Sequence, residues 1–271
     1  MRSTAKTTWG GNLLAAISDI VDGVRLFPVW GYLALRDIRS RYRRTLFGPF
    51  WIAGSAVITS LALGLVFGGL FGRPLGEIVP YIASGVIIWT YLSSFVFEGG
   101  GIFVMAAGTI KTLPLPYSFY IFKSAAINAL IFAHNLVAFV IIVLILNHGL
   151  ALNPIFVPGF VLVTLLGLAW ALPIAIMAAR YRDLLYMMSY VGMLAYFLTP
   201  IFWHIKDLPP QRAALMAYNP LIYPINVLRK PLFGEMPALA DWTHTLAMLG
   251  VGVVVSLLVY APTRRRIVFW L

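Results

Sequence analysis

Five arginines stand close together in the N-terminal part of the chain and form its densest candidate site for an anionic ligand: Arg36, Arg39, Arg41, Arg43 and Arg44. The planar guanidinium group binds phosphate oxygens through two parallel N–H donors, so this cluster can hold the phosphate of a lipid headgroup. The same charges can also act simply as a topology anchor on the cytoplasmic side of a membrane. The two interpretations are compatible, and the residues alone leave both open.

The residue patterns of common enzymes are missing. No Gly-Lys pair occurs, so the chain has no phosphate-binding loop of the G-x-x-x-x-G-K-[ST] type, and neither H-E-x-x-H nor G-x-S-x-G is present. With 0 cysteines, disulfides, thiolate metal sites and thiol nucleophiles are excluded. We therefore expect no catalytic residue, no metal site and no cofactor in this chain, which disfavours an enzyme that acts alone.

The composition indicates that lipid surrounds most of the chain. Hydrophobic residues make up 61% of it and charged residues only 11%, whereas about 25% charged is usual for soluble domains. The net charge of +11 is explained by cytoplasmic loops and anionic lipid more simply than by nucleic acid, which we do not expect as a partner.

Six apolar blocks are candidates for membrane-spanning helices, because crossing the hydrocarbon core takes about 20 apolar residues. Five fit directly, and a sixth, 117–146, is longer and therefore tilted or partly interfacial. The five are residues 49–71, 78–97, 156–179, 184–203 and 242–262. We expect an all-α membrane protein with about six transmembrane helices, an N-terminal amphipathic interface helix and short re-entrant or interfacial helices before the last span. It forms a single domain over 1–271, with a cytoplasmic or interface segment at 1–48, a bundle at 49–262 and a tail at 263–271.

Basic residues orient these spans. With both termini in the cytoplasm, fifteen Lys and Arg residues fall on the inner side and five on the outer side. The positive-inside rule therefore predicts cytoplasmic termini.

Two segments outside the spans are expected to be short helices near the membrane surface. In residues 35–46, Leu35, Ile38, Tyr42 and Leu46 are spaced as one helical stripe, which predicts a helix lying in the interface plane. The apolar segment 221–233 is too short to span and contains two prolines, which is typical of a re-entrant or interfacial helix.

The inner loop 98–116 predicts a short apolar helix bounded by glycines 99–101 and by Pro114 and Pro116. Its residues Ile102, Phe103 and Met105 suit a peg that docks into another protein. An interfacial helix resting on lipid fits the same composition.

The middles of the spans carry no ionisable group apart from His134. Carriers coupled to protons or sodium ions generally need carboxylates or charge relays at this depth, so ion coupling is disfavoured. For His134, a neutral hydrogen-bonded histidine in helix packing is favoured over a proton site.

Aromatic residues recur on two helix faces. Tyr91 and Phe95 share a face of the second span, and Tyr186, Tyr190 and Phe197 share a face of the fifth. Such faces can line a channel for sugars, since rings stack on the C–H faces of pyranoses. Aromatic residues also form interfacial belts and pack against lipid, and for any single ring that interpretation is favoured.

Five motifs in order resemble the permeases of ABC-2 polysaccharide exporters, the group that includes O-antigen, teichoic-acid and capsule export systems. The resemblance covers about residues 30–262, with departures at Phe47, where Leu is usual, and Ala56, where Pro often occurs. The motifs are R-Y-R-R-T-L-F-G-P-F-W at 41–51, L-P-L-P at 113–116, R-Y-R-D-L at 180–184, T-P-I-F-W at 199–203 followed by Leu208-Pro209, and Asn219-Pro220 with Arg229.

The resemblance implies a bacterial inner-membrane, multi-pass protein. Two copies would assemble with two cytoplasmic ATPase subunits that bind ATP and Mg²⁺, and the substrate would be a glycan on undecaprenyl pyrophosphate. Arg41, Arg43, Arg44 and Trp51 would meet the lipid pyrophosphate, and the aromatic faces named above would line the pore. Coupling to the ATPase would involve Glu98, Ile102, Phe103, Met105, Arg180, Arg182 and Asp183.

Two alternatives remain. One is an ABC-2 exporter of a drug or a small lipo-oligosaccharide, and the less favoured one is an ion-coupled carrier or channel.

Overall fold

The fold is helical. The computed structural model describes residues 9–41, 43, 50–146 and 151–271, and within these ranges all regular elements are helices. One isolated backbone bridge pairs Ala151 with Phe233. The predicted all-α class is confirmed.

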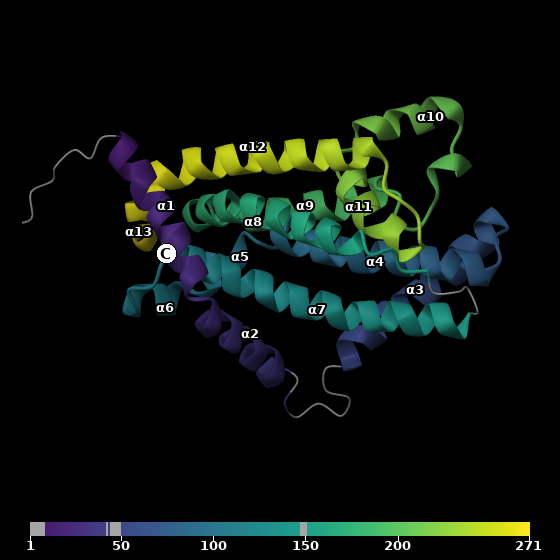
Figure 1. The fold of residues 1–271 in the computed structure, drawn as a ribbon, viewed down its shortest axis with the longest axis horizontal. Coiled ribbons are helices and arrows are strands. Elements are labelled where there is room, and N and C mark those ends of the chain that lie inside the picture. Colours follow the sequence, from purple (N-terminus) through teal and green to yellow (C-terminus); the bar gives the residue numbers. More distant parts are fainter. Residues whose placement is uncertain (1–8, 42, 44–49, 147–150) are drawn as a thin grey trace, which may run out of the picture.

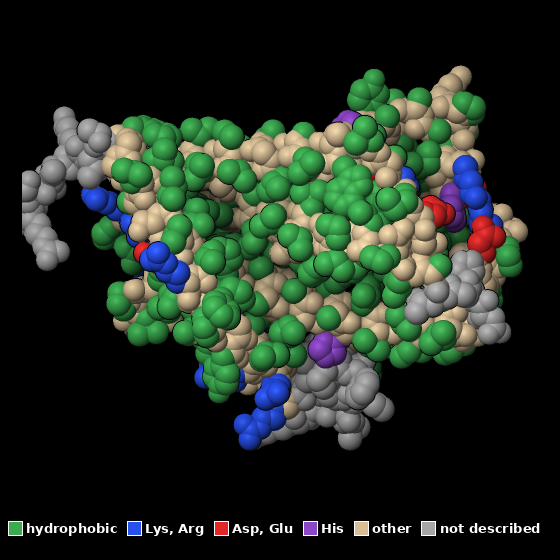
Figure 2. Space-filling model, viewed as in Figure 1, with side chains coloured by type: hydrophobic (Ala, Val, Ile, Leu, Met, Phe, Trp, Pro, Cys, Tyr) green, Lys and Arg blue, Asp and Glu red, His purple; other side chains and the backbone are tan. Residues whose placement is uncertain are grey.

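Five helices are long and apolar enough to cross a membrane. Figure 1 shows four of them, α4, α7, α8 and α12, running along the long axis of the molecule, and Figure 2 shows charged side chains mainly toward the two ends and along α2, with an apolar surface between. The five are α3 (Phe50–Phe71), α4 (Leu75–Val96), α7 (Tyr117–Ile145), α8 (Phe156–Arg180) and α12 (Leu239–Thr263). The chain is thus a multi-pass membrane protein.

The predicted fifth span is shorter than expected. Its helix, α9 (Asp183–Leu198), has 16 residues, which is about 24 Å at 1.5 Å per residue and falls short of a core of about 30 Å. It ends because Thr199 precedes Pro200 and is extended, at φ −100° and ψ 140°, as the proline ring requires of the residue before it. The prediction of a helix continuing to residue 203 was wrong for this reason.

The N-terminal segment forms two helices, α1 (Trp9–Arg25) and α2 (Phe27–Arg41). The predicted interface helix at 35–46 matches only the second half of α2, and Tyr42, Arg44 and Leu46 lie outside the described residues. The predicted lipid-facing stripe is wrong where it can be checked, because Ile38 is buried while Leu35 is exposed. The sequence did not lead us to expect α1.

Short helices gather at the two ends of the bundle (Figure 1). Figure 1 places α1, α5 (Gly101–Met105), α6 (Ala107–Thr112) and α13 (Ile267–Trp270) toward the end of the molecule where the C-terminus lies, and we call it the terminal end. In the chain, η3 (Arg264–Arg266) joins α12 to α13 there. The opposite α10 end holds η1 (Ile205–Asp207), α10 (Pro210–Leu215), η2 (Met216–Tyr218) and α11 (Ile222–Leu232). The short helix expected at 98–116 is therefore two helices, and the one expected at 221–233 is α11.

Candidate functional site

A cavity of about 710 Å³ lies between α3, α4, α7 and α9. Hydroxyl, amide and carboxylate groups line it among apolar side chains at helix positions that lie in the membrane. Its lining includes Trp51, Ser55, Thr59, Trp89, Thr90, Ser93, Glu98, Asn135, Ser189, Gly192 and Tyr196. We call it the first cavity.

Several hydroxyl groups of the first cavity donate to carbonyls of their own helix. Thr90 Oγ1 donates to the carbonyl of Val86 at 2.8 Å, and Ser189 Oγ donates to that of Leu185 at 2.9 Å. Ser93 Oγ donates to Thr90 and also to Glu98 Oε1, both at 3.2 Å. Because their protons are satisfied internally, these groups are tolerated at membrane depth, and their oxygen lone pairs can still accept from a polar cargo.

A second cavity of about 780 Å³ lies nearer the terminal end, between α2, α4, the α5–α6 segment and α7. Arg36, Arg41 and Glu98 line it, together with Asp37 and Lys123, whose carboxylate and ammonium groups form an ion pair at 2.6 Å. The second cavity therefore holds more charged side chains than the first, and a buried anionic group needs such charged partners.

The two cavities meet, because Thr90, Glu98, Ile131 and Asn135 line both. We call these four residues the junction. Side by side, the two cavities extend from α2 at the terminal end to the α3 and α9 side of the bundle, and we call the pair the polar path. A third cavity of about 680 Å³, between α2, α7 and α8, is lined almost entirely by apolar side chains and suits lipid chains better.

The predicted pore aromatics fall in two different places. Tyr91 and Phe95 are buried in a cluster with Phe132 and Phe160. The Tyr91 hydroxyl lies 2.7 Å from Thr164 Oγ1, and Tyr91 still borders the second cavity. Phe95 packs against Gly167 inside the bundle and lines neither polar cavity, because α7 and α8 cover that face of α4.

The α9 aromatics are exposed. Tyr186 is 71% and Tyr190 68% exposed, and Phe197 is also exposed, although its ring contacts that of Phe202 edge-on. They line neither polar cavity within this single chain.

The predicted headgroup residues are only partly placed. Arg41 borders the second cavity and Trp51 the first. Arg43 lies exposed in a turn, and Arg44 is outside the described residues.

The predicted coupling residues gather at the terminal end. Glu98, Ile102 and Met105 border the second cavity, and Met105 is 86% exposed. Phe103 is fully buried against the Tyr117 ring, so its ring cannot itself contact a partner in this structure.

The turn between α8 and α9 lies at the same end. The Arg180 guanidinium lies 5.2 Å from the ring centres of Tyr181 and Trp270, and Arg182 and Asp183 are exposed. His134 Nδ1 lies 2.7 Å from the carbonyl of Leu130 on its own helix, in line with a hydrogen-bonded packing role.

Sequence reasoning missed most of the first cavity, including Thr59, Trp89, Ser93, Ser189 and Tyr196. A usable signal existed, since Ser and Thr recur in the first, second and fifth spans, where apolar residues are the rule. No group of three His, Asp or Glu side chains in the described part of the chain could hold a metal ion.

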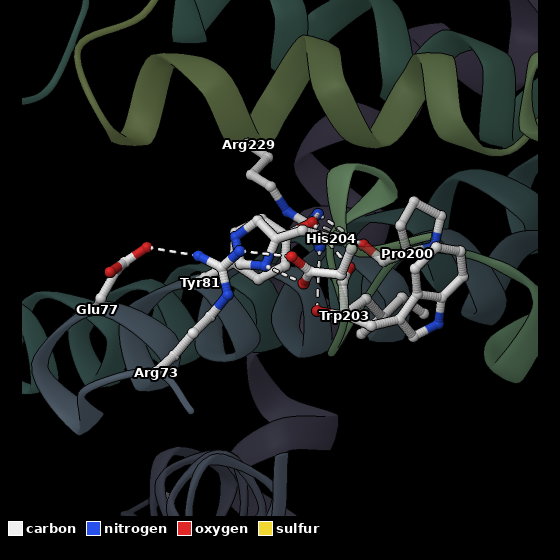
Figure 3. A network of polar contacts seen from close by, with 9 residues as sticks. Arg73, Glu77, Tyr81, Pro200, Trp203, His204 and Arg229 are labelled. Atoms are coloured by element: carbon white, nitrogen blue, oxygen red, sulfur yellow. Dashed lines mark hydrogen bonds and ion pairs between the residues drawn. The ribbon is translucent and has the colours of Figure 1, made fainter. Parts of the chain in front are cut away.

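A polar network stands at the α10 end (Figure 3). Arg73, which follows α3, donates to Glu77 Oε1 at 2.8 Å and to Asp207 Oδ1 at 2.6 Å. His204 stacks on the Tyr81 ring with centroids 3.7 Å apart. The Tyr81 hydroxyl lies 3.2 Å from the carbonyls of both Pro200 and Trp203. The network thus ties the segment after α9 to the start of α4.

Arg229 of α11 completes this network and is only 5% exposed. Its Nη1 donates to the Tyr81 hydroxyl and to the Pro200 carbonyl, both at 2.7 Å, and its Nη2 donates to the Ile201 carbonyl at 3.4 Å. A Cβ added at Gly85 would lie 2.2 Å from Nη2, so only glycine leaves room for the guanidinium there.

The network makes stability depend on pH through His204. Burial and then the positive charge of Arg73 lower the pKa of His204 from its ordinary 6.5 to about 4, although Asp207 pulls it the other way. Because the folded pKa lies below the unfolded one, the histidine contributes no destabilisation above pH 6.5, and stability falls as the pH drops from 6.5 toward 4. At pH 5 we expect a loss of about 2 kcal/mol relative to pH 7.5.

The thermal unfolding midpoint of purified protein at the two pH values measures this loss. His204→Phe keeps a ring on Tyr81 but does not titrate, so its midpoint should fall less at pH 5 than that of the wild type. His244→Phe is the control, because His244 also stacks on a tyrosine, Tyr223, but is exposed. An equal fall in wild type and His204→Phe would contradict the prediction.

The helices and cavities define a polytopic membrane protein with a polar path through its bundle. Residues 29–233 match the family described as ABC-2 type transporter, and the chain belongs to that family. It is therefore the transmembrane subunit of an ABC transporter, a class that pairs with ABC ATPase subunits. Two proteins of Klebsiella pneumoniae, both described as O-antigen export system permease protein RfbA, are each 20% identical to it over 200 residues, which cover 72% of this chain and 76% of theirs.

Proposed function

We propose that this protein moves a lipid-linked polysaccharide, O-antigen-like or related, from the cytoplasmic side across the bacterial inner membrane. ATP would be hydrolysed, with Mg²⁺, by two separate ATPase subunits. The observation that carries the proposal is the pair of adjoining cavities that makes up the polar path, with its charged section at the terminal end. The distant similarity to O-antigen export permeases supports the substrate class.

The orientation follows from charge. Fifteen of the twenty basic residues belong to the N-terminal segment, the C-terminal tail and the loops on their side of the membrane. That distribution supports a cytoplasmic location for the terminal end, and with it for the second cavity. A lipid-linked substrate would arrive there with its pyrophosphate at headgroup depth, beside Arg36, Arg41 and Lys123.

A second copy of the chain would complete the channel. The first cavity is bounded by α3 and α9, and these helices are poorly covered: α3 is the least buried of the five long helices, and on α9 only Gly192 is buried. The exposed Tyr186 and Tyr190 carry hydroxyls, which suit a glycan path or a protein partner better than lipid chains. Facing copies would bring both α9 aromatic faces toward one channel.

The function is tested by depleting the protein in its native host and following lipid-linked glycan. Accumulation of undecaprenyl-linked glycan on the cytoplasmic face, reversed by the wild-type gene, is the expected result. Normal surface glycan together with retention of a drug or a small lipo-oligosaccharide would contradict the proposal in favour of another ABC-2 cargo.

Changing Arg41, Arg43 and Arg44 together to Lys is expected to lower glycan export while abundance and ATPase association stay near normal. Lysine preserves positive charge, and hence topology, but lacks the two-pronged contact with phosphate. Losing a bidentate contact of about 1.5–3 kcal/mol corresponds to a reduction of roughly tenfold or more. Surface glycan per inserted protein measures the effect.

The matched control changes Arg25, Arg265 and Arg266 to Lys, since these arginines are exposed at the same end but do not border the second cavity. If the variant with Arg41, Arg43 and Arg44 changed to Lys exported glycan at the wild-type rate, these three arginines would serve only as topology anchors.

A further inference from the structure

Asp19 of α1 is a deeply buried carboxylate that joins segments distant in the sequence. It is only 1% exposed. Its oxygens accept from the backbone N–H groups of Tyr117 and Ser118 at 3.1 and 3.0 Å, and from Arg264 Nε and Nη2 at 3.3 and 3.2 Å. One side chain thus connects α1, the start of α7 and the segment after α12.

The contact satisfies a specific need of α7. The first N–H groups of a helix have no partner within it, and Pro116, the residue before α7, provides no side-chain cap. Asp19 supplies the missing acceptor from another helix, and its negative charge also favours the positive end of the α7 dipole.

The backbones of α1 and of the start of α7 lie close together around Asp19. Ser118 Oγ donates to the Asp19 carbonyl at 2.6 Å. One turn further along α1, a Cβ added at Gly23 would lie 2.1 Å from Ser118 Oγ. The two helices therefore pack closely here, with the Ser118 side chain and the edge of the Phe122 ring against Gly23.

This cluster lies at the start of α7, where the chain from the α5–α6 segment enters that helix. Residues 113–116 lead from α6 directly into α7, and the same α7 supplies Lys123 to the second cavity and Ile131 and Asn135 to the junction. The α5–α6 segment borders the second cavity itself, but its displacement is carried along α7 to Ile131 and Asn135 only if the start of α7 moves with its surroundings and does not yield alone.

We infer that Asp19 is a positioning residue that makes α1, the start of α7 and the segment 264–270 move as one body. Through this body, movement imposed on the α5–α6 segment by an ATPase is transmitted along α7 to the cavities. The inference rests on the proposed function, in which the α5–α6 segment contacts the ATPase.

The first test compares Asp19→Ala with Asp22→Ala in the assembled complex with its ATPase. Asp22 lies on the same helix but is exposed and pairs only with Arg25 and Ser18 in the described contacts. Asp19→Ala is expected to retain ATP hydrolysis within about twofold while glycan exported per ATP falls about tenfold, a change in coupling worth roughly 1.4 kcal/mol. Asp22→Ala should match the wild type in both. An Asp19→Ala complex that exports normally would overturn the inference.

Because Asp19→Ala could lower export simply by disrupting the fold, a second variant that keeps the fold is needed. Removing one partner of a buried ion pair strands the other charge, whereas removing both charges is often nearly neutral. Asp19→Asn combined with Arg264→Gln keeps hydrogen-bonding groups at both positions, so we expect near-normal insertion and export per ATP. Poor coupling in this well-inserted double variant would show that the bonds do not suffice, and would overturn the inference.

A disulfide gives the decisive test, because the chain contains 0 cysteines. Gly23→Cys with Ser118→Cys places two Cβ atoms about 3.0 Å apart, so α1 and α7 must separate by roughly 0.5 Å or more to reach the usual range of about 3.5–4.5 Å in disulfides. In the Asp19→Ala background, oxidation should restore export per ATP and reduction should abolish it again. The inference is contradicted if the oxidised disulfide does not restore export per ATP in the Asp19→Ala background. It is also contradicted if the disulfide abolishes export while Asp19 is intact, because α1 and α7 would then have to move apart.

The two proposals fail differently. Wild-type complex that exports no glycan contradicts the proposed function. Wild-type complex that exports glycan, together with an Asp19→Ala complex that couples equally well, contradicts only the role of Asp19.

Discussion

Replacing Arg229 by methionine is expected to destabilise the protein by about 3 kcal/mol or more, the usual cost of stranding buried hydrogen-bonding groups. The change leaves the Ile201 carbonyl without its Arg229 donor and removes one of the two donors to the Pro200 carbonyl. It also removes the guanidinium from above the Tyr81 ring, where it lies 4.2 Å from the ring centre. Methionine fills a similar volume, so the loss comes mainly from the missing donors.

The thermal unfolding midpoint and the protease sensitivity of residues 199–209 measure the effect. Arg212→Met is the matched control, because Arg212 lies at the same end on α10 but is exposed. The unfolding midpoint of Arg229→Lys should lie between those of Arg229→Met and the wild type, since one ammonium group cannot reach every acceptor. A midpoint for Arg229→Met equal to that of Arg212→Met would mean that the network at the α10 end is not structural.

The spans could be predicted because lipid imposes a simple requirement on sequence. A block of about 20 apolar residues indicates that lipid surrounds it. Such blocks predicted α3, α4, α7, α8 and α12. Helix-breaking glycine and proline residues likewise predicted short helices near residues 98–116 and 221–233.

Helix ends and surface helices were harder to predict. The helix of the fifth span stops at Leu198 because of Pro200, a signal that the long apolar run to residue 203 obscured. The helix α1 also had a signal, since Leu14, Ile17, Val21 and Val24 repeat at helical spacing and are all exposed. Asp19 and Asp22 interrupt these apolar residues, which weakens the signal.

The cavities could not be predicted from single helix faces. Tyr91 and Phe95 share a face, but whether that face meets a channel or another helix depends on α7 and α8, which cover it. The contacts of Asp19 depend on residues 98, 99 and 245 positions away. No local pattern encodes such a contact, because it arises only when three distant segments pack together.

Replacing Ile131 by tryptophan is expected to block the polar path at the junction, where Ile131 lines both cavities. Ile131 borders both cavities, so a larger apolar ring there fills the junction without removing any hydrogen bond. Glycan export should fall at least about tenfold, which needs only about 1.4 kcal/mol of added barrier. Insertion and association with the ATPase should remain, because the terminal end is untouched.

Val137→Trp is the matched control, since Val137 is also a β-branched residue of α7 but is exposed and borders neither polar cavity. Glycan exported per inserted protein is compared for the two variants, with the thermal unfolding midpoint of each checked because overpacking alone can cost about 1–3 kcal/mol. Ile131→Ala, which widens the junction, should export at least as well as the wild type. Equal export by Ile131→Trp and Val137→Trp would show that the cargo does not pass between Thr90, Ile131 and Asn135. The route would then have to be sought along the exposed faces of α3 and α9 alone.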